Sequence, residues 1–242
     1  MILLFTDFGE GGFYTGQMRA LLAERAPGVP VIDLMHDAPA YAPGCASYLL
    51  AALTPAMPKG ATIVAVVDPG VGGPRRPIVV RADGRQFVGP DNGLFELVMR
   101  RARDVSCESI EWRPKVLSAT FHGRDLFAPV AASLAKGTVE DCTLRPVEPL
   151  RFPRWPDDLP AVIYIDGYGN LITGLRAATL PPGTRVGLGG AALQRARTFG
   201  DVPSGVLMWY ENSIGLIEIA VNKGNAARLL SASIGTEVKL ET

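Results

Sequence analysis

The chain has 242 residues, of which 48% belong to the hydrophobic set and 20% are charged. This is enough apolar material for one large core or two smaller ones. Lysine plus arginine and aspartate plus glutamate both total 24, so the formal net charge is zero. That balance argues against a protein that holds nucleic acid through a basic surface.

The first residues predict a buried strand, and neither a signal peptide nor a membrane span is expected. Apolar residues 1–5 have no basic segment before them, and Asp7 follows almost at once. Apolar runs stay well short of the ~18 residues that a membrane-spanning helix needs. The three cysteines, Cys45, Cys107 and Cys142, are scattered and form no CxxC pair. They favour a reduced, cytoplasmic location.

Strand and helix patterns alternate over the first 145 or so residues. Apolar runs predict strands at 2–6, 29–34, 62–67, 77–82 and 86–89, and helical spacing predicts helices at 14–26, 44–53, 93–103 and 125–137. Gly137 is a suitable residue to end the last helix. Such alternation is typical of an α/β domain with a central, largely parallel sheet, which we assign to residues 1–148.

The pattern changes at a proline-rich stretch. Residues 146–160 contain five prolines, a density that neither continues a helix nor joins a central strand. We therefore predict a linker at 149–160. Short β-type runs follow at 161–166, 170–175, 184–189, 205–210, 215–221 and 236–240. Turn signals between them predict a small all-β domain, antiparallel and barrel-like, over residues 161–242.

Acidic residues cluster where the predicted strands end. Asp7, Asp33, Asp37 and Asp68 follow the first three strands, and ligands of open α/β sheets bind beyond these strand ends. Helix capping or turn formation is an equally good explanation for any one of them. A phosphate-binding loop has little support, because the chain contains neither GxGxxG nor GxxxxGK[ST].

The chain has two histidines, His36 and His122. Together with Asp7, Asp68 and Asp91 they could form a mixed His/carboxylate metal site. HxxxH and HxD spacings are absent, so we predict no metal. His122 precedes a helix, and capping that helix is its alternative role.

Three further polar segments have ordinary structural explanations. In VGPDNGLFE (88–96), Asp91 or Asn92 can cap the following helix. The segment YIDGYGNLIT (164–173) fits a simple hairpin. WYENSIGLIEIAVNKGNAA (209–227) is richer in polar residues than a plain β-run needs. Its polar residues either bind a ligand or simply satisfy turns; they are Asn212, Ser213, Glu218, Asn222 and Asn225.

Taken in order, eight motifs resemble the S-adenosyl-L-methionine (SAM) hydroxide adenosyltransferases, which are relatives of the adenosyl-fluoride and adenosyl-chloride synthases. The motifs are TDFG at 6–9, YxGQM at 14–18, DLMHD at 33–37, VVDPGVGGPRR at 66–76, FVGPDNGLF at 87–95, TFHGRDLFAPVAA at 120–132, YIDGYGN at 164–170 and NSIGLIEIAVNKGNAA at 212–227. They extend over nearly the whole chain and both predicted domains.

The resemblance implies a SAM hydrolase, in which water attacks C5′ in line and the products are adenosine and L-methionine. A sulfonium is an excellent leaving group, so the enzyme has mainly to position water and exclude other solvent. No metal or other cofactor is implied. The resemblance also implies a homotrimer, with each site between the N-terminal domain of one subunit and the C-terminal domain of a neighbour.

The catalytic residues that the resemblance implies are Asp68, Arg75 and His122, the set associated with the nucleophilic water in the hydroxide branch. A carboxylate repels a halide but can orient water or accept its proton, and Arg75 can hold it by a bidentate pair. The implied substrate-binding residues are Asp7 for the ribose diol, Tyr41, Phe121 and Gly123 near the ribose and C5′, Asn170 for adenine, and Asp166 and Ser213 for the methionine end. Glu218 and the Val221 backbone lie on the strand that closes the adenine pocket, and Tyr210 is a further substrate-binding residue.

The departures from the family pattern concern the methionine end. Gly12 and Phe13 stand where relatives often have an acid, Gly174 replaces a frequent asparagine, and Ile214 replaces an arginine of the fluorinating relatives. Two alternatives to the hydrolase remain open: a non-catalytic adenosine- or SAM-binding module, and a halide-dependent adenosyltransferase.

Overall fold

The computed structural model describes residues 1–9, 11–138 and 142–241. The chain forms two compact units, Met1–Phe152 and Pro153–Thr242. The division falls inside the predicted linker 149–160, whose two ends belong to the units themselves. The Leu150 amide donates to Asp91 of the first unit at 2.9 Å, whereas Leu159 already begins a strand of the second.

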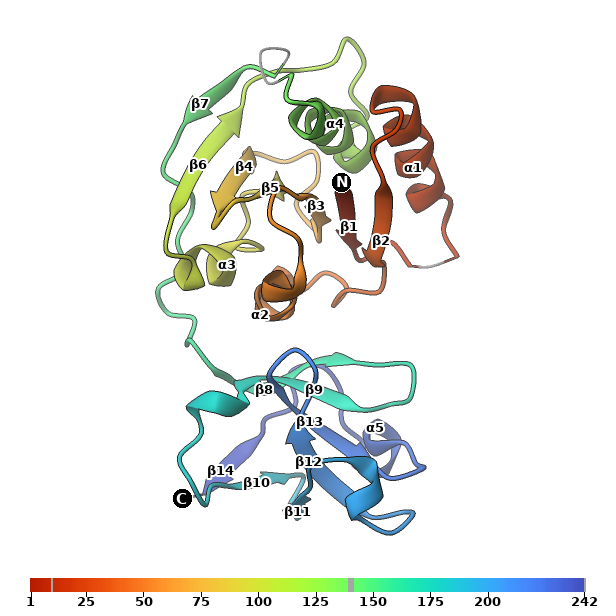
Figure 1. Cartoon of the computed structure of the whole chain (residues 1–242), viewed down its shortest axis with the longest axis vertical. Helices are drawn as coiled ribbons and strands as arrows, with labels where there is room; N and C mark the ends of the chain where they lie inside the picture. The colour runs from red at the N-terminus through yellow and green to blue at the C-terminus, as the bar shows by residue number, and fades with distance from the viewer. Residues whose placement is uncertain (10, 139–141, 242) are drawn as a thin grey trace. The chain divides into compact units, whose positions relative to one another are not determined.

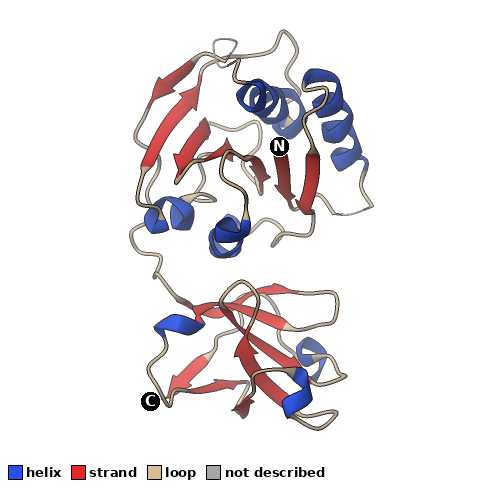
Figure 2. Cartoon of the chain, viewed as in Figure 1, coloured by secondary structure: helices blue, strands red, loops and turns tan. Residues whose placement is uncertain are grey.

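The first unit is a seven-stranded sheet with helices on both faces (Figures 1 and 2). The strand order is β2-β1-β3-β5-β4-β6-β7. The strands are β1 (Ile2–Thr6), β2 (Val31–Met35), β3 (Thr62–Val66), β4 (Pro77–Ala82), β5 (Arg85–Pro90), β6 (Val105–Ile110) and β7 (Leu144–Pro146). The helices are α1 (Phe13–Arg25), α2 (Pro43–Leu53), α3 (Glu96–Arg101) and α4 (Ala128–Lys136).

The sheet is mixed, which corrects the prediction of a largely parallel one. β1 runs parallel to β2 and β3, and β3 is parallel to β5. The pairs β4–β5, β4–β6 and β6–β7 are antiparallel. The reason is a two-residue turn at Asp83 and Gly84, both with positive φ (47° and 79°), which joins β4 to β5 as a hairpin. An Asp-Gly pair between two apolar runs is a hairpin signal, so the sequence did contain this information.

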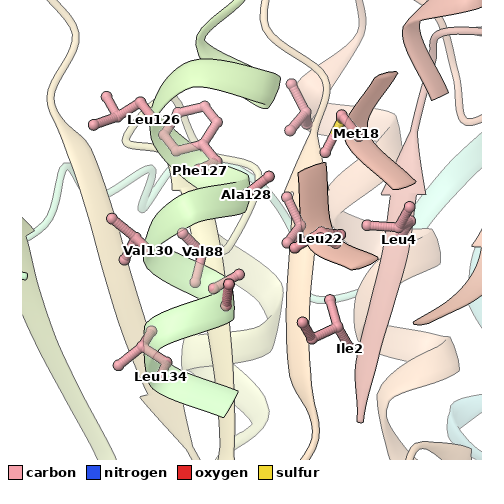
Figure 3. Packing of buried hydrophobic residues seen from close by; sticks show 14 of the residues in the cluster. Ile2, Leu4, Met18, Leu22, Val88, Leu126, Phe127, Ala128, Val130 and Leu134 are labelled. Carbon is pink, nitrogen blue, oxygen red and sulfur yellow. The ribbon is translucent and has the colours of Figure 1, made fainter. Parts of the chain in front are cut away.

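The core of the first unit lies between the sheet and its helices. β1 and β3 are buried at every residue, as expected of central strands that are covered on both faces. In Figure 1, α1 and α4 cover one face, and α2 and α3 cover the other. Met18 and Leu22 of α1 pack in one apolar cluster with Phe127 and Val130 (Figure 3). Burying each such side chain stabilises the fold by about 1.5–3 kcal/mol.

The predicted helix 125–137 has a less regular start. A π-helical turn, Gly123–Phe127, precedes α4, and such turns are frequent at functional sites. The other end is as predicted: Gly137 adopts the left-handed conformation (φ 76°) after Lys136.

The second unit is also built on a seven-stranded sheet, ordered β14-β10-β11-β12-β13-β9-β8. Its strands are β8 (Leu159–Ile165), β9 (Leu171–Arg176), β10 (Arg185–Leu188), β11 (Ala191–Arg195), β12 (Leu207–Glu211), β13 (Leu216–Val221) and β14 (Lys239–Glu241). A bridge between Ala161 and Glu237 links β8 to the segment before β14, so the two edges of the sheet are connected. The prediction of an all-β, antiparallel domain needs two corrections: a short helix, α5 (Ala226–Leu229), and a parallel pair, β11–β12.

Over the residues described above, each helix is too short or too polar to span a membrane.

Candidate functional site

A cavity of about 280 Å³ lies in the first unit, at the carboxyl ends of β1 and β3. Asp7 and Phe8 follow β1, and Asp68 lies two residues beyond β3. This is where ligands bind in open α/β sheets. The lining residues are Asp7, Phe8, Tyr14, Tyr41, Val66, Asp68, Val71, Thr120, Phe121, His122 and Gly123. Six of these lining residues are predicted site residues. The seventh predicted site residue of this unit, Arg75, does not line the cavity but is bonded to Asp68 and His122.

Asp68, Arg75 and His122 form one hydrogen-bonded group. Arg75 Nε donates to Asp68 Oδ1 and Oδ2 at 3.1 and 2.9 Å, and Nη2 donates to Oδ2 at 2.5 Å. The predicted bidentate pairing of Arg75 with Asp68 is therefore present. Arg75 Nη2 also lies 2.8 Å from His122 Nδ1. The side chains of Asp68 and Arg75 are only 3% and 9% exposed, so little water competes for these bonds.

The contact with Arg75 determines the protonation state of His122. A guanidinium has no lone pair to offer, so Nδ1 must accept, and the neutral imidazole must carry its proton on Nε2. Burial, and next the positive charge of Arg75, lower the pKa of His122 below its usual 6.5. His122 is thus a neutral side chain whose Nε2–H is a hydrogen-bond donor. Its one nitrogen lone pair is occupied, so it is not placed to act as a base.

A glycine brings the loop that carries Asp68 against the segment before His122. Gly72 has φ 77°, and a Cβ there would lie 2.4 Å from the carbonyl oxygen of Ala119. Any side chain at this position would separate the two segments. Gly72 therefore serves close backbone packing, and no phosphate-binding geometry is needed to explain it.

Asp7 is held by the backbone of Tyr41. The Tyr41 amide donates to Asp7 Oδ2 at 3.2 Å, and Tyr41 adopts a left-handed conformation (φ 58°) that is uncommon for a non-glycine residue. Burial raises the pKa of Asp7, the Tyr41 bond opposes this, and the negative charge of Asp68 adds to the rise. A carboxylate has about four acceptor positions, so Asp7 retains capacity to bind two hydroxyl groups of a ligand.

Aromatic rings form one wall of the cavity. Phe8, Tyr14 and Phe121 are in mutual contact, with ring centroids 5.1–5.8 Å apart, and Tyr41 is 81% exposed. Phe8 and Tyr14 were not predicted as site residues, although they lie in the motifs TDFG and YxGQM. Apolar walls with a few aligned polar groups are typical of small-molecule sites.

In the second unit, Asp166 and Asn170 stabilise the turn between β8 and β9. Asp166 Oδ1 accepts the amides of Tyr168 and Asn170, both at 2.9 Å, and Oδ2 accepts Asn170 Nδ2 at 3.0 Å. Both side chains therefore have structural roles in addition to the ligand contacts that the resemblance implies. The Asn170 residue is 5% exposed.

A second polar group of this unit lies on β12 and β13. The Tyr210 hydroxyl donates to Glu218 Oε1, and Asn212 Nδ2 donates to Glu218 Oε2 at 3.1 Å. Burial and the carboxylate raise the pKa of Tyr210, which keeps the phenol protonated as a donor. Ser213 is exposed in the turn between the two strands, and Val221 is buried at the end of β13.

Of the groups considered for a metal, Asp7, Asp68 and His122 line the cavity, whereas His36 and Asp91 do not. His36 Nδ1 is 2.8 Å from Thr6 Oγ1, and Asp91 is bonded to Arg76. In the part of the chain that the structure describes, no three His, Cys, Asp or Glu side chains are grouped as metal ligands.

Fold and site together define a class: a two-unit protein whose first unit has a cavity at the carboxyl edge of a mixed sheet, beside a buried Asp–Arg–His group. The chain matches the model of the SAM hydroxide adenosyltransferase N-terminal domain over residues 2–143, and that of the C-terminal domain over residues 160–239. It therefore belongs to the SAM hydroxide adenosyltransferase family.

Relatives with similar sequences support this assignment. The chain is 43% identical to the (R)-S-adenosyl-L-methionine hydrolase of Thermus thermophilus, with 99% of this chain and 98% of the relative aligned. It is 38% identical to the protein of the same name from Salinispora arenicola, covering 97% and 95%. A crystal structure of an uncharacterized conserved protein from Thermotoga maritima matches over the full length of both chains, with 31% identity and a TM-score of 0.85.

Proposed function

We propose that the protein hydrolyses SAM to adenosine and L-methionine by in-line attack of water on C5′. The observation that carries the proposal is the Asp68–Arg75–His122 group, two members of which line the cavity. The names of the relatives specify the (R) form of SAM, and we extend that substrate to this chain.

Asp68 and His122 supply complementary contacts for a water molecule. The Nε2–H of His122 donates to the water oxygen, and a carboxylate oxygen of Asp68 accepts one of the water protons. The remaining oxygen lone pair is then directed at C5′. Arg75 fixes both partners, because one guanidinium bonds to Asp68 and to His122. Positioning of this kind contributes most when surrounding solvent is excluded.

The step balances without a redox partner. The water oxygen forms a bond to C5′, the C5′–S bond breaks, and its electron pair neutralises the sulfonium to give the thioether of methionine. The water proton passes to Asp68 and then to solvent. The negative charge of Asp68 disfavours a halide in the same place, which supports hydrolysis over halide transfer.

The other implied roles are part of the same proposal. Asp7 binds the ribose diol, with Tyr41, Phe121 and Gly123 around the ribose and C5′. Asn170 binds the adenine, Glu218 and the Val221 backbone close the adenine pocket, and Asp166 and Ser213 bind the methionine end. Tyr210 is a further substrate-binding residue. The resemblance further supports a homotrimer, with each site completed by a neighbouring subunit, and a cytoplasmic location. Light scattering on the purified protein tests the trimer.

The decisive assay incubates purified protein with (R)- and (S)-SAM in heavy-oxygen water and analyses the nucleoside by mass spectrometry. The proposal expects heavy oxygen in the 5′-hydroxyl of adenosine, faster turnover of the (R) form, and no loss of activity with EDTA. Binding of adenosine without turnover would instead identify a non-catalytic module. Chloride-dependent formation of 5′-chloro-5′-deoxyadenosine would identify a halide-using enzyme.

A further inference from the structure

The motif GPDNG, at the end of β5, lies beside the loop that carries Asp68 and Arg75. This loop leaves β3 after Val66 and enters β4 at Pro77. β5 lies between β3 and β4 in the sheet, and Pro77 is paired with Pro90. The loop must therefore pass the carboxyl end of β5, where Asp91 and Asn92 stand.

Asn92 holds the first end of the loop. Its Nδ2 donates to the carbonyl of Val67 at 2.9 Å, directly before Asp68. Its Oδ1 accepts the amide of Leu94 at 3.2 Å, which determines the orientation of the side-chain amide and aims the NH₂ group at the loop.

Asp91 holds the other end of the loop. Its Oδ2 accepts Arg76 Nε at 3.1 Å and Nη2 at 2.7 Å, directly after Arg75. The Asp91 amide also donates to the carbonyl of Arg76 at 2.9 Å. The Asp91 side chain is 2% exposed and that of Arg76 is 41% exposed, so the two side-chain bonds are charge-assisted and partly buried. The predicted helix-capping role of Asp91 and Asn92 is wrong, because the first residue of α3 is Glu96 and no side chain caps it.

We infer that Asn92 and Asp91 are positioning residues for hydrolysis: they fix the two ends of loop 67–76, and so place the Asp68 carboxylate and the Arg75 guanidinium against each other and against the cavity. The inference rests on the proposed roles of Asp68 and Arg75. Neither Asn92 nor Asp91 lines the cavity, so each acts through the loop and not on the substrate.

Two variants test the two ends: Asn92→Ala and Asp91→Asn. A displacement of about 1 Å at a reacting group can cost on the order of a hundred-fold in rate. We expect each variant to lower kcat by roughly ten- to a hundred-fold while KM for SAM stays within about two-fold, because the binding groups around the cavity are unchanged.

Glu96→Gln is the matched control. Glu96 is 1% exposed and binds Arg100 at 2.8 Å and Arg151 at 3.0 Å. Like Asp91, Glu96 is a buried carboxylate that bonds to the segment around residue 150: the Phe152 amide donates to Glu96 at 3.3 Å. Unlike those of Asp91, the hydrogen bonds of Glu96 do not involve loop 67–76. We expect Glu96→Gln to lower the unfolding temperature, as Asp91→Asn does, and to leave kcat unchanged.

A double variant separates positioning from general damage. In an Asp68→Asn background the group to be positioned is already disabled, so adding Asn92→Ala should lower kcat by less than about two-fold further. If Asn92→Ala and Asp91→Asn are folded and as active as wild type, or if the losses multiply in the double variant, the inference is wrong. A wild type that forms no adenosine would instead refute the proposed function, which is a separate outcome.

Discussion

Replacing Asp68 by asparagine removes the proposed proton acceptor with almost no change in side-chain shape. Asp68 accepts three hydrogen bonds from Arg75, two of them at Oδ2. An asparagine that keeps its oxygen at the Oδ2 position retains those two bonds and loses the one at Oδ1. The buried Arg75 guanidinium also loses its counter-charge, and removing one partner of a buried ion pair costs about 3–5 kcal/mol of unfolding free energy, or roughly 6 to 20 °C in Tm for a unit of this size.

The expected effect on catalysis is measured separately, on the folded protein. A general base contributes about 100- to 10,000-fold, so kcat should fall by that factor. The affinity for adenosine should change little, because Asp7, the proposed ribose contact, is unchanged. Adenosine formation is followed chromatographically, adenosine binding by calorimetry and unfolding by scanning fluorimetry.

Asp158→Asn provides the control for this variant. Asp158 pairs with Arg176 in the same bidentate manner, at 2.7 Å to both Nε and Nη2, but in the second unit. The Asp158→Asn variant should lower the free energy of unfolding and leave the turnover of SAM unchanged. A folded Asp68→Asn protein that turns over within about three-fold of wild type would refute the role of Asp68 as base, because even a modest general base contributes about 100-fold.

Three further predictions concern the same cavity. Asp7→Asn should raise Tm at pH 7, because burial raises the pKa of Asp7 and ionising this carboxyl group therefore costs stability. A variant with a lower Tm would contradict this reasoning. The same variant should weaken adenosine binding by about 10- to 100-fold in calorimetry. For His122, whose pKa is lowered below 6.5, the unfolded chain binds the extra proton first, so stability should fall as the pH drops below about 6.5. The kcat should fall only at lower pH, where His122 of the folded protein takes up its proton. His122→Gln should flatten this limb of the pH profile, and an unchanged profile would show that another group titrates. Gly72→Ala should lower Tm far more than Gly28→Ala, since both have positive φ but only at Gly72 does a Cβ meet the Ala119 carbonyl, at 2.4 Å; equal losses would show that only the backbone conformation matters.

Much of the fold was accessible from local sequence patterns. Apolar runs predicted β1 and β4 to the residue, because burial of a whole strand leaves a clear local signal. The sheet direction was missed although Asp83 and Gly84 signalled the hairpin. β6 was missed because it is half-exposed, and β7 because it is an edge strand of three residues. The strand character of both comes from pairing with a neighbour.

The sequence by itself determined the family, the order of motifs and the residue types at the site, because these depend on local chemistry. Only the tertiary structure decided how the residues act on one another. Arg75 lies 47 positions from His122 in the chain, yet its contact makes that imidazole a donor. Likewise, the local sequence favours Asn92 as a helix cap, whereas the strand order β3-β5-β4 places it beside the loop that carries Asp68. Such contacts depend on which strands are neighbours, and short-range patterns do not specify that pairing.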